Sequence, residues 1–184
     1  FGRLGGLWET QITYYPPDGS PPRHAEGEWE FGYALEGRAV IDVWQVPGRG
    51  GLDGEPRSPD HECGLCVRIW DPRLQLWRFT FHGTARGLVV HLFARQIGDE
   101  IVMERAEGAQ LIRWVFSDIH AESFLWRSET SHDGGHSWRL EQEVRARRAP
   151  RMDASSPDAR SELAGVLAVA GPHSSLGDQA LVFD

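Results

Sequence analysis

The chain has 184 residues, of which 40% are hydrophobic and 25% charged, and its formal net charge is −8 at pH 7. A chain of this length buries a substantial core as one domain. Nucleic acid and anionic membrane surfaces bind proteins that present a basic face, so the negative charge argues against both as partners. No apolar run approaches the roughly 20 residues of a membrane span. No signal-peptide pattern opens the sequence either, so we expect a cytoplasmic protein.

All 19 basic residues are arginine, because the sequence contains no lysine. The absence of lysine excludes Schiff-base chemistry and phosphate capture by a P-loop lysine. The sequence also contains no nucleophile elbow and no glycine-rich phosphate loop, and its one His-x-x-x-His spacing, His132 and His136, falls in a predicted turn and not on a helix. We therefore expect a protein that uses no cofactor and no metal.

Short stretches of alternating apolar and polar residues predict strands along most of the first 148 residues. The clearest stretch is 28–35, where Trp29, Phe31 and Tyr33 share one face. The stretch 47–62 is rich in glycine, proline and charge, and predicts a long loop. The predicted strands are 7–15, 28–35, 38–46, 66–70, 76–82, 88–97, 100–105, 110–118, 123–131 and 137–147.

No proline lies between Pro72 and Pro150. Because proline is excluded from paired strands, this gap favours an uninterrupted antiparallel meander. The predicted fold class is therefore all-β, with a closed barrel of about ten strands formed by residues 1–148. Almost every predicted strand carries one of the eight tryptophans, which indicates an aromatic interior.

The composition changes after Arg148. A serine followed by Pro157 is a typical helix start, and residues 158–170 predict a short helix. The end of the chain, 180–183, is apolar enough to dock on another surface. We interpret 149–184 as an appendage of the barrel rather than a second domain. Since exposed apolar patches usually find a partner, a homodimer formed through this tail is a hypothesis.

Gly6-Leu7-Trp8 stands at the start of the first strand, and the last strand ends in an arginine cluster (Arg145, Arg147, Arg148). This pairing resembles the calycin superfamily, which includes lipocalins and fatty-acid-binding proteins. In that superfamily a tryptophan of the first strand packs beneath an arginine of the last and closes one end of the barrel. The physical basis is a cation held over an indole face.

Four further segments resemble bacterial lipocalin-like families of unknown function. They are 36–44 (Glu-Gly-Arg-Ala-Val-Ile-Asp-Val-Trp), 112–119, 124–127 and 131–138. The resemblance covers roughly residues 4–148 and implies a barrel with an internal cavity, but it assigns no catalytic residues. The sequence departs from it in the 47–62 loop, in the Cys63 and Cys66 pair, and in the tail.

The segment from Ser131 to Trp138 also resembles the Asp-box hairpin of sialidase propellers. A single copy cannot build a propeller, so we interpret it as a structural turn, with carbohydrate recognition as the alternative. His61, Cys63 and Cys66 offer at most three ligands, fewer than a structural zinc site uses. Ordinary cysteines are therefore favoured over a metal site or a regulatory disulfide.

Ionisable side chains that share a strand face with aromatic residues are the candidate site residues, because burial among rings perturbs their pKa values. Asp42 lies on one face with Trp44, and Arg68 lies on one face with Trp70, by the two-residue period of a strand. Both pairs are predicted to face the cavity. For Asp42 the alternative is a structural role in which its carboxylate is hydrogen-bonded or ion-paired.

The same period places His91 on one face with Phe93 and Arg95. Trp114 and Trp126 are predicted to form further cavity walls. His82 and Glu129 are weaker candidates, because their faces carry more polar residues.

The first functional hypothesis is a cofactor-independent cyclase, isomerase or lyase that acts on an apolar cyclic or polyene molecule. Asp42 and His91 would form the acid–base pair, and Arg68 or Arg95 would hold a developing enolate or carboxylate. The alternatives are a carrier of a small hydrophobic ligand, a haem-binding barrel ligated by His91 or His82, and a purely structural module.

Overall fold

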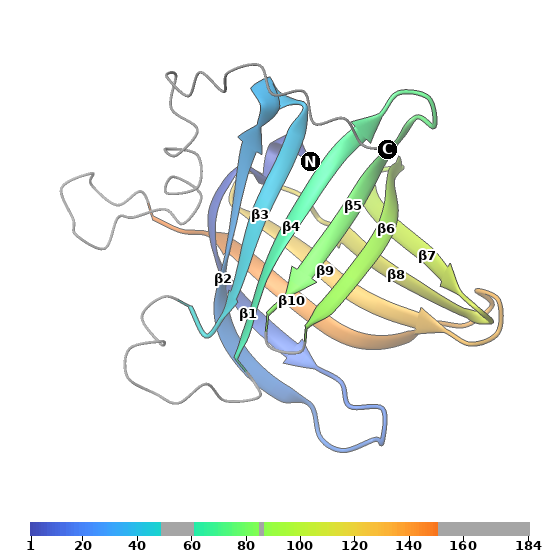
Figure 1. Ribbon diagram of the computed structural model, residues 1–184. Coiled ribbons are helices and arrows are strands. Elements are labelled where there is room, and N and C mark those ends of the chain that lie inside the picture. The colour runs from blue at the N-terminus through green and yellow to red at the C-terminus, as the bar shows by residue number, and fades with distance from the viewer. Residues whose placement is uncertain (49–60, 85–86, 151–184) are drawn as a thin grey trace.

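The computed structural model describes residues 1–48, 61–84 and 87–150 (Figure 1). Two short 3-10 turns, η1 (Gly2–Leu4) and η2 (Leu35–Gly37), accompany ten strands. The strands are β1 (Gly6–Tyr14), β2 (Arg23–Ala34), β3 (Ala39–Val46), β4 (Glu62–Asp71), β5 (Leu76–Gly83), β6 (Leu88–Ile97), β7 (Glu100–Glu107), β8 (Gln110–Ser117), β9 (Ser123–Ser131) and β10 (Arg139–Arg148).

The strands form one closed antiparallel barrel in which each strand pairs with its neighbours in the sequence. The barrel closes between β1 and β10, where Trp8 lies opposite Arg148 and Tyr14 opposite Gln142. The predicted all-β barrel of about ten strands is therefore confirmed. Among the described residues, no helix has the length and apolar character that a membrane span needs.

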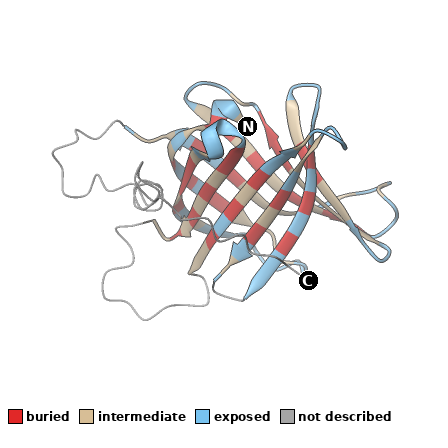
Figure 2. Ribbon diagram, turned by 45° about the horizontal axis from the view of Figure 1, so that its top comes forward, coloured by how far each residue is buried: buried red, intermediate tan, exposed pale blue. Residues whose placement is uncertain are grey.

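Buried and exposed residues alternate along the strands (Figure 2). The alternation follows from the strand geometry, because successive side chains point to opposite faces of the sheet. In β3, for example, Val40, Asp42, Trp44 and Val46 point into the barrel. This inner face supplies the core and positions every side chain of the cavity described below.

Two strands start earlier than the alternation predicts. The second begins at Arg23 instead of residue 28, and the fourth at Glu62 instead of residue 66. Each extension pairs along its full length with a neighbouring strand: Arg23 lies opposite Tyr14, and Glu62 opposite Val46. Backbone pairing therefore extends the strands into segments whose side chains carry no clear apolar period.

One end of the barrel is closed by Trp8, which is fully buried. Its Nε1 donates a hydrogen bond of 2.7 Å to the carbonyl of Leu4, and its ring packs edge-on against Phe124. The Cζ of Arg148 lies 4.1 Å from the Trp8 ring centroid, and Arg148 Nη1 donates to the carbonyl of Gly5 at 2.8 Å. The predicted cation over an indole is present, and Arg148 supplies it.

The connection between β9 and β10 is the turn that resembles an Asp box. Asp133 accepts hydrogen bonds from the Ser137 hydroxyl at 2.6 Å and the Ser137 amide at 2.9 Å. These bonds lower the pKa of the exposed Asp133 carboxyl to about 2. Gly135 has a φ of 92°, and its carbonyl accepts a hydrogen bond from Trp138 Nε1. The segment is thus organised by its own local bonds, as the structural interpretation predicts.

The predicted helix 158–170, the apolar tail 180–183 and most of the 47–62 loop lie outside the described residues. The homodimer hypothesis and the division into a barrel and an appendage remain predictions.

Candidate functional site

The barrel encloses a cavity of about 270 Å³ whose walls are mainly aromatic. Four of the eight tryptophans contribute, from β2, β3, β8 and β9. The residues that line the cavity are Trp29, Trp44, Glu62, Cys66, Arg68, Phe79, Phe81, Leu88, Met103, Trp114, Trp126, Glu141 and Gln142. Apolar walls with a few polar groups are typical of sites for small molecules.

The cavity continues into a wider hollow of about 650 Å³ at the end of the barrel opposite Trp8. Leu88 and Phe81 line both spaces, as do Glu62, Glu141 and Gln142. The Phe81 ring can lie flat against β4 only because residue 64 is glycine, since a Cβ there would collide with the ring. The barrel therefore has a closed end and an open mouth.

A buried ion pair lies behind the cavity wall. Arg68 Nη1 donates to Asp42 Oδ2, and Trp29 Nε1 donates to Asp42 Oδ1 at 2.5 Å. The sheet register explains both contacts. Asp42 lies directly opposite Phe31 on β2 and Cys66 on β4, so Trp29 and Arg68 are its diagonal neighbours on the same face.

Both members of this pair are completely buried. Arg68 lines the cavity, whereas Asp42 does not. Asp42 lies behind the cavity wall, in contact with the wall residues Arg68 and Trp29. Asp42 therefore positions Arg68 and Trp29, and its two oxygens are already occupied by these donors. This arrangement fits an orienting group better than a general base.

Aromatic rings surround the guanidinium of Arg68. Its Cζ lies 4.7 Å from the ring centroid of Phe1 and 4.8 Å from that of Phe79. Burial lowers the pKa of Arg68, and the facing carboxylate of Asp42 holds the guanidinium in its charged form. A cation with ring faces on two sides and one carboxylate partner is rigidly oriented.

Two donors of the cavity wall have no hydrogen-bond partner among the described residues. They are the Nε of Arg68 and the Nε1 of Trp126, both buried. Buried donors are nearly always satisfied in folded proteins, and both of these residues line the cavity, so they are the groups of its wall that call for an acceptor from outside the chain.

The structure brings together five of the predicted site residues. Trp44, Arg68, Trp114 and Trp126 line the cavity, and Asp42 stands behind Arg68. Trp114 and Trp126 meet edge to face with their ring centroids 5.5 Å apart.

Trp70 lies at the rim of the closed end rather than in the cavity. It follows Arg68 on the inward phase of β4 but is 43% exposed. Its ring packs against Trp77 at 5.7 Å. The strand has run past the enclosed part of the barrel at this point, so Trp70 does not line the cavity described here.

The prediction that His91, Phe93 and Arg95 face the cavity is wrong. All three point outward, because Val90, Leu92 and Ala94 occupy the inner face of β6. The sequence pattern is ambiguous here, since both phases of this strand carry large apolar residues. Arg95 instead pairs with Glu104 on the surface, at 3.0 Å.

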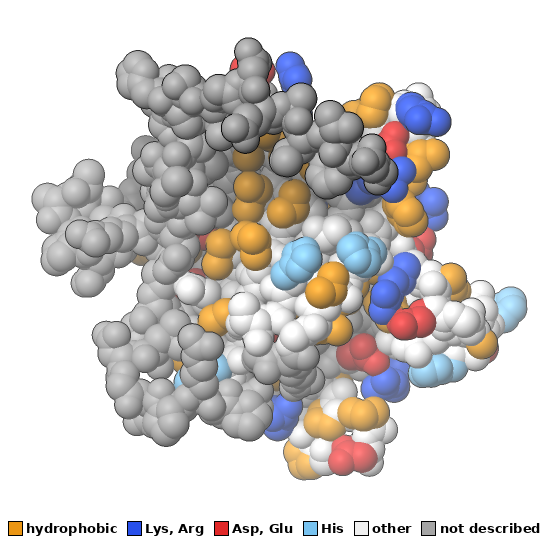
Figure 3. All heavy atoms as spheres, in the orientation of Figure 1, with side chains coloured by type: hydrophobic (Ala, Val, Ile, Leu, Met, Phe, Trp, Pro, Cys, Tyr) orange, Lys and Arg blue, Asp and Glu red, His pale blue; other side chains and the backbone are white. Residues whose placement is uncertain are grey.

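These residues belong to an outer surface that carries several exposed apolar side chains. Figure 3 shows hydrophobic side chains over β3 to β6 with histidines among them. Exposed members are Leu65, Ile69, Val89 and Phe93. His82 also lies on this outer face, and Glu129 forms outer ion pairs with Arg113 and Arg127.

An acid–base pair of Asp42 and His91 is excluded. Asp42 is buried inside the barrel and His91 lies on its outer face, so the sheet separates the two side chains.

Several cavity residues were absent from the sequence prediction. Trp29 is not among the predicted site residues, yet it lines the cavity and donates a hydrogen bond to Asp42. Phe79 and Phe81 alternate with His82 and Thr80, so their phase could have suggested them. Met103 lies in β7, which contains no aromatic residue that would have indicated its inner face.

Cys63 and Cys66 are not joined by a disulfide. Three residues along a strand span about 10 Å, which exceeds the reach of a disulfide at about 7 Å. An odd spacing also puts the two side chains on opposite faces, so they cannot share a metal ion. The disulfide and metal alternatives are thus excluded for this pair.

The two cysteines are expected to differ in reactivity. Burial raises the pKa of the Cys66 thiol well above its ordinary value. We expect iodoacetamide to modify Cys66 at least about tenfold more slowly than Cys63 in the native protein, since the thiolate is the reactive form and each pKa unit lowers its fraction tenfold. Peptide mass spectrometry at timed intervals measures both rates. Equal rates would contradict the buried position of Cys66, and in urea the difference should disappear.

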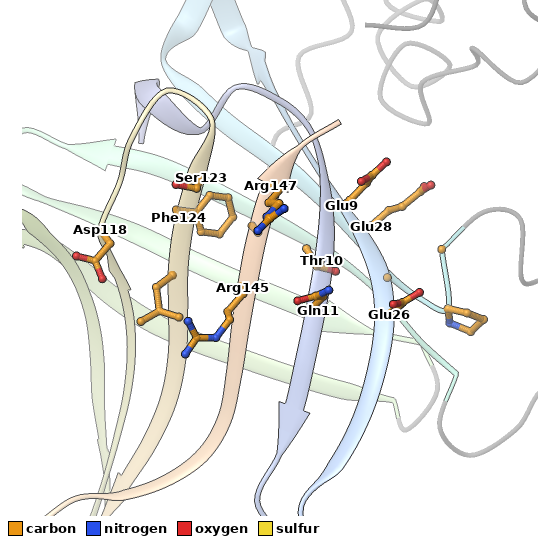
Figure 4. Close-up of a pocket in the computed structure, with 15 residues that line it drawn as sticks. Glu9, Thr10, Gln11, Glu26, Glu28, Asp118, Ser123, Phe124, Arg145 and Arg147 are labelled. Atoms are coloured by element: carbon orange, nitrogen blue, oxygen red, sulfur yellow. The ribbon is translucent and has the colours of Figure 1, made fainter. Parts of the chain in front are cut away.

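A second hollow, of about 670 Å³, lies on the outer side of β10, β1 and β2 (Figure 4). Glu9, Glu26 and Glu28 line one side, and Arg145 and Arg147 the other. It is larger than the interior cavity, but it is open and its charges of both signs are on the surface. Arg145, for instance, already pairs with Glu143 at 2.8 Å. We therefore place the candidate site in the interior.

No family model and no curated protein matches this chain. Solved structures do match its fold. The protein Rv2717c from M. tuberculosis is 13% identical, with a TM-score of 0.52 over 80% of this chain and 94% of its own. The S-type phycobiliprotein lyase CPES from Guillardia theta is 6% identical, with a TM-score of 0.50 over 82% and 91%. At such identities the matches show a shared barrel fold, and the predicted lipocalin-like architecture is confirmed.

Proposed function

We propose that this protein binds a small hydrophobic molecule inside its barrel. The observation that carries the proposal is the cavity itself: aromatic walls, an open mouth, and two buried donors without a partner among the described residues. A purely structural barrel would fill this space with side chains. The likeness to a phycobiliprotein lyase agrees with a barrel that handles a small molecule, although it extends to the fold alone.

Binding without chemistry has more support than the cyclase, isomerase or lyase hypothesis. Catalysis by an acid–base pair requires two groups within reach of the substrate. His91 lies outside the barrel, and both oxygens of Asp42 are engaged by Arg68 and Trp29. Native mass spectrometry followed by extraction separates the two cases, because a carrier releases its ligand chemically unchanged after long incubation.

The haem-binding alternative loses its basis. It required His91 or His82 inside the barrel, but both lie on the outer face. Within the part of the chain that the structure describes, the residues around the cavity include no histidine.

Narrowing the mouth should weaken binding. Leu88 lines both the cavity and the mouth, and its side chain is exposed. A larger side chain at this position can therefore extend across the mouth without crowding the core. We expect Leu88→Trp to lower the affinity for propyl-(dimethylamino)naphthalene, a neutral fluorescent aromatic, by about tenfold or more, equal to about 1.4 kcal/mol. Fluorescence titration measures the change.

Val89→Trp is the matched control. Val89 is as exposed as Leu88, at 46% against 45%, but it points to the outer face. Its substitution should leave the affinity unchanged within about twofold. If both variants bind the dye as the unchanged protein does, the ligand does not enter through this mouth and the proposal fails.

A further inference from the structure

Building on the proposed function, we infer the chemical class of the ligand: a neutral, flat aromatic molecule that carries a hydrogen-bond acceptor such as a carbonyl. The structure assigns Arg68 Nε–H and Trp126 Nε1–H as the groups that receive this acceptor. The inference rests on three independent features of the cavity, namely its unpaired donors, its charge and its shape.

The unpaired groups define the polarity of the ligand. Arg68 is completely buried and Trp126 is 6% exposed, and both line the cavity. Their nitrogens Nε and Nε1 have no partner among the described residues. Guanidinium and indole groups donate and never accept. An incoming molecule can therefore satisfy them only with an acceptor atom, and a pure hydrocarbon would leave both buried donors unmet, which is costly.

The charges of the wall define the charge of the ligand. Arg68 is the single cation among the described cavity residues, and Asp42 already neutralises it. A carboxylate ligand bound to Arg68 would lie close to the Asp42 carboxylate in a medium of low dielectric. It would also have to pass Glu62 and Glu141 at the mouth. Burying an anion without a free counter-ion is unfavourable, so a neutral acceptor is preferred.

The walls define shape and size. Trp126 meets Trp29 and Trp114 edge to face, with ring centroids 5.8 Å and 5.5 Å away. Rings in this arrangement leave flat faces and edges for another aromatic group. The volume of about 270 Å³ is nearly twice that of an engineered apolar cavity of about 150 Å³ known to hold benzene. The enclosed part of the ligand therefore has the size of two fused rings.

Three probes of one size test the assignment on the unchanged protein: propionyl-(dimethylamino)naphthalene, its propyl analogue without an acceptor, and the corresponding naphthoate anion. We expect the propionyl probe to bind about tenfold more tightly than either of the others, the amount that modest hydrogen bonds from Arg68 and Trp126 to one acceptor provide together. Fluorescence titration measures all three affinities. Equal affinities, or tighter binding of the anion, overturn the ligand class and leave the proposed function standing. Failure of all three to bind overturns the proposed function itself.

Substitution of Trp126 tests the donor. Trp126→Phe removes the Nε1–H and keeps an aromatic wall, so we expect the advantage of the propionyl over the propyl probe to fall from about tenfold to about threefold, with Arg68 Nε–H supplying the remainder. Trp44→Phe is the matched control, because Trp44 lines the same cavity but its nitrogen is not among the buried unpaired atoms. That variant should weaken both probes alike and keep their ratio. An unchanged ratio in Trp126→Phe overturns the role of Trp126, and the probe comparison on the unchanged protein decides the ligand class even if a variant does not fold.

Discussion

Asp42→Ala is expected to lower the free energy of unfolding by about 3–5 kcal/mol, because it leaves the guanidinium of Arg68 buried without a counter-ion. Both side chains are completely buried, and Asp42 also accepts the hydrogen bond of Trp29 Nε1. The variant therefore loses an ion pair and leaves two donors unmet in the core. Urea denaturation followed by tryptophan fluorescence measures the change.

Two further variants isolate the cause. Replacing both partners, as Asp42→Leu with Arg68→Met, should restore most of the stability, since an apolar pair of similar volume avoids the buried charge. Glu104→Ala breaks the Arg95–Glu104 pair, whose arginine is 61% exposed, and should cost less than about 1 kcal/mol. If Asp42→Ala costs no more than Glu104→Ala, the Arg68 guanidinium is not buried as the structure describes.

Trp8→Ala is the second substitution with a large expected effect, about 3–5 kcal/mol from the loss of a buried indole and the cavity that remains. Trp8 is fully buried at the closed end and packs on Phe124. Without its ring, Arg148 loses the face over which its guanidinium lies at 4.1 Å. Thermal and urea unfolding of the variant measure the loss.

Trp138 provides a matched comparison for this prediction. It too carries an arginine over its ring, with Arg113 Cζ at 3.8 Å from the centroid, but it lies in the half-buried turn between β9 and β10. Trp138→Ala should cost only about 1–2 kcal/mol, the sum of a cation–π contact and partial burial. Equal losses in the two variants would show that Trp8 does not close the barrel.

The alternation of apolar and polar residues was sufficient to predict most of the strands, because successive side chains of a strand point to opposite faces of the sheet. The proline-free stretch before Pro150 likewise predicted the antiparallel meander. The early starts of β2 and β4 were not predictable, since those segments are held by backbone pairing with β1 and β3. Backbone hydrogen bonds use groups that nearly every residue carries, so the side-chain composition does not reveal them.

The candidate site was predictable in part. Asp42 and Arg68 were identified because an ionisable group among aromatic neighbours is conspicuous in a strand, and the structure joins them. The prediction for His91 was wrong because both phases of β6 carry large apolar residues. The alternation therefore does not indicate which phase faces the interior.

By itself the sequence determined the all-β class, the approximate strand count and the aromatic character of the interior, because these depend on local periodicity and composition. Only the tertiary structure decided which face of each strand lines the cavity and that Asp42 stands behind Arg68 instead of facing a ligand. It also decided that Arg68 and Trp126 each keep a donor with no partner among the described residues. Those features depend on the register of the strands and on barrel closure between β1 and β10, which bring together residues far apart in the chain.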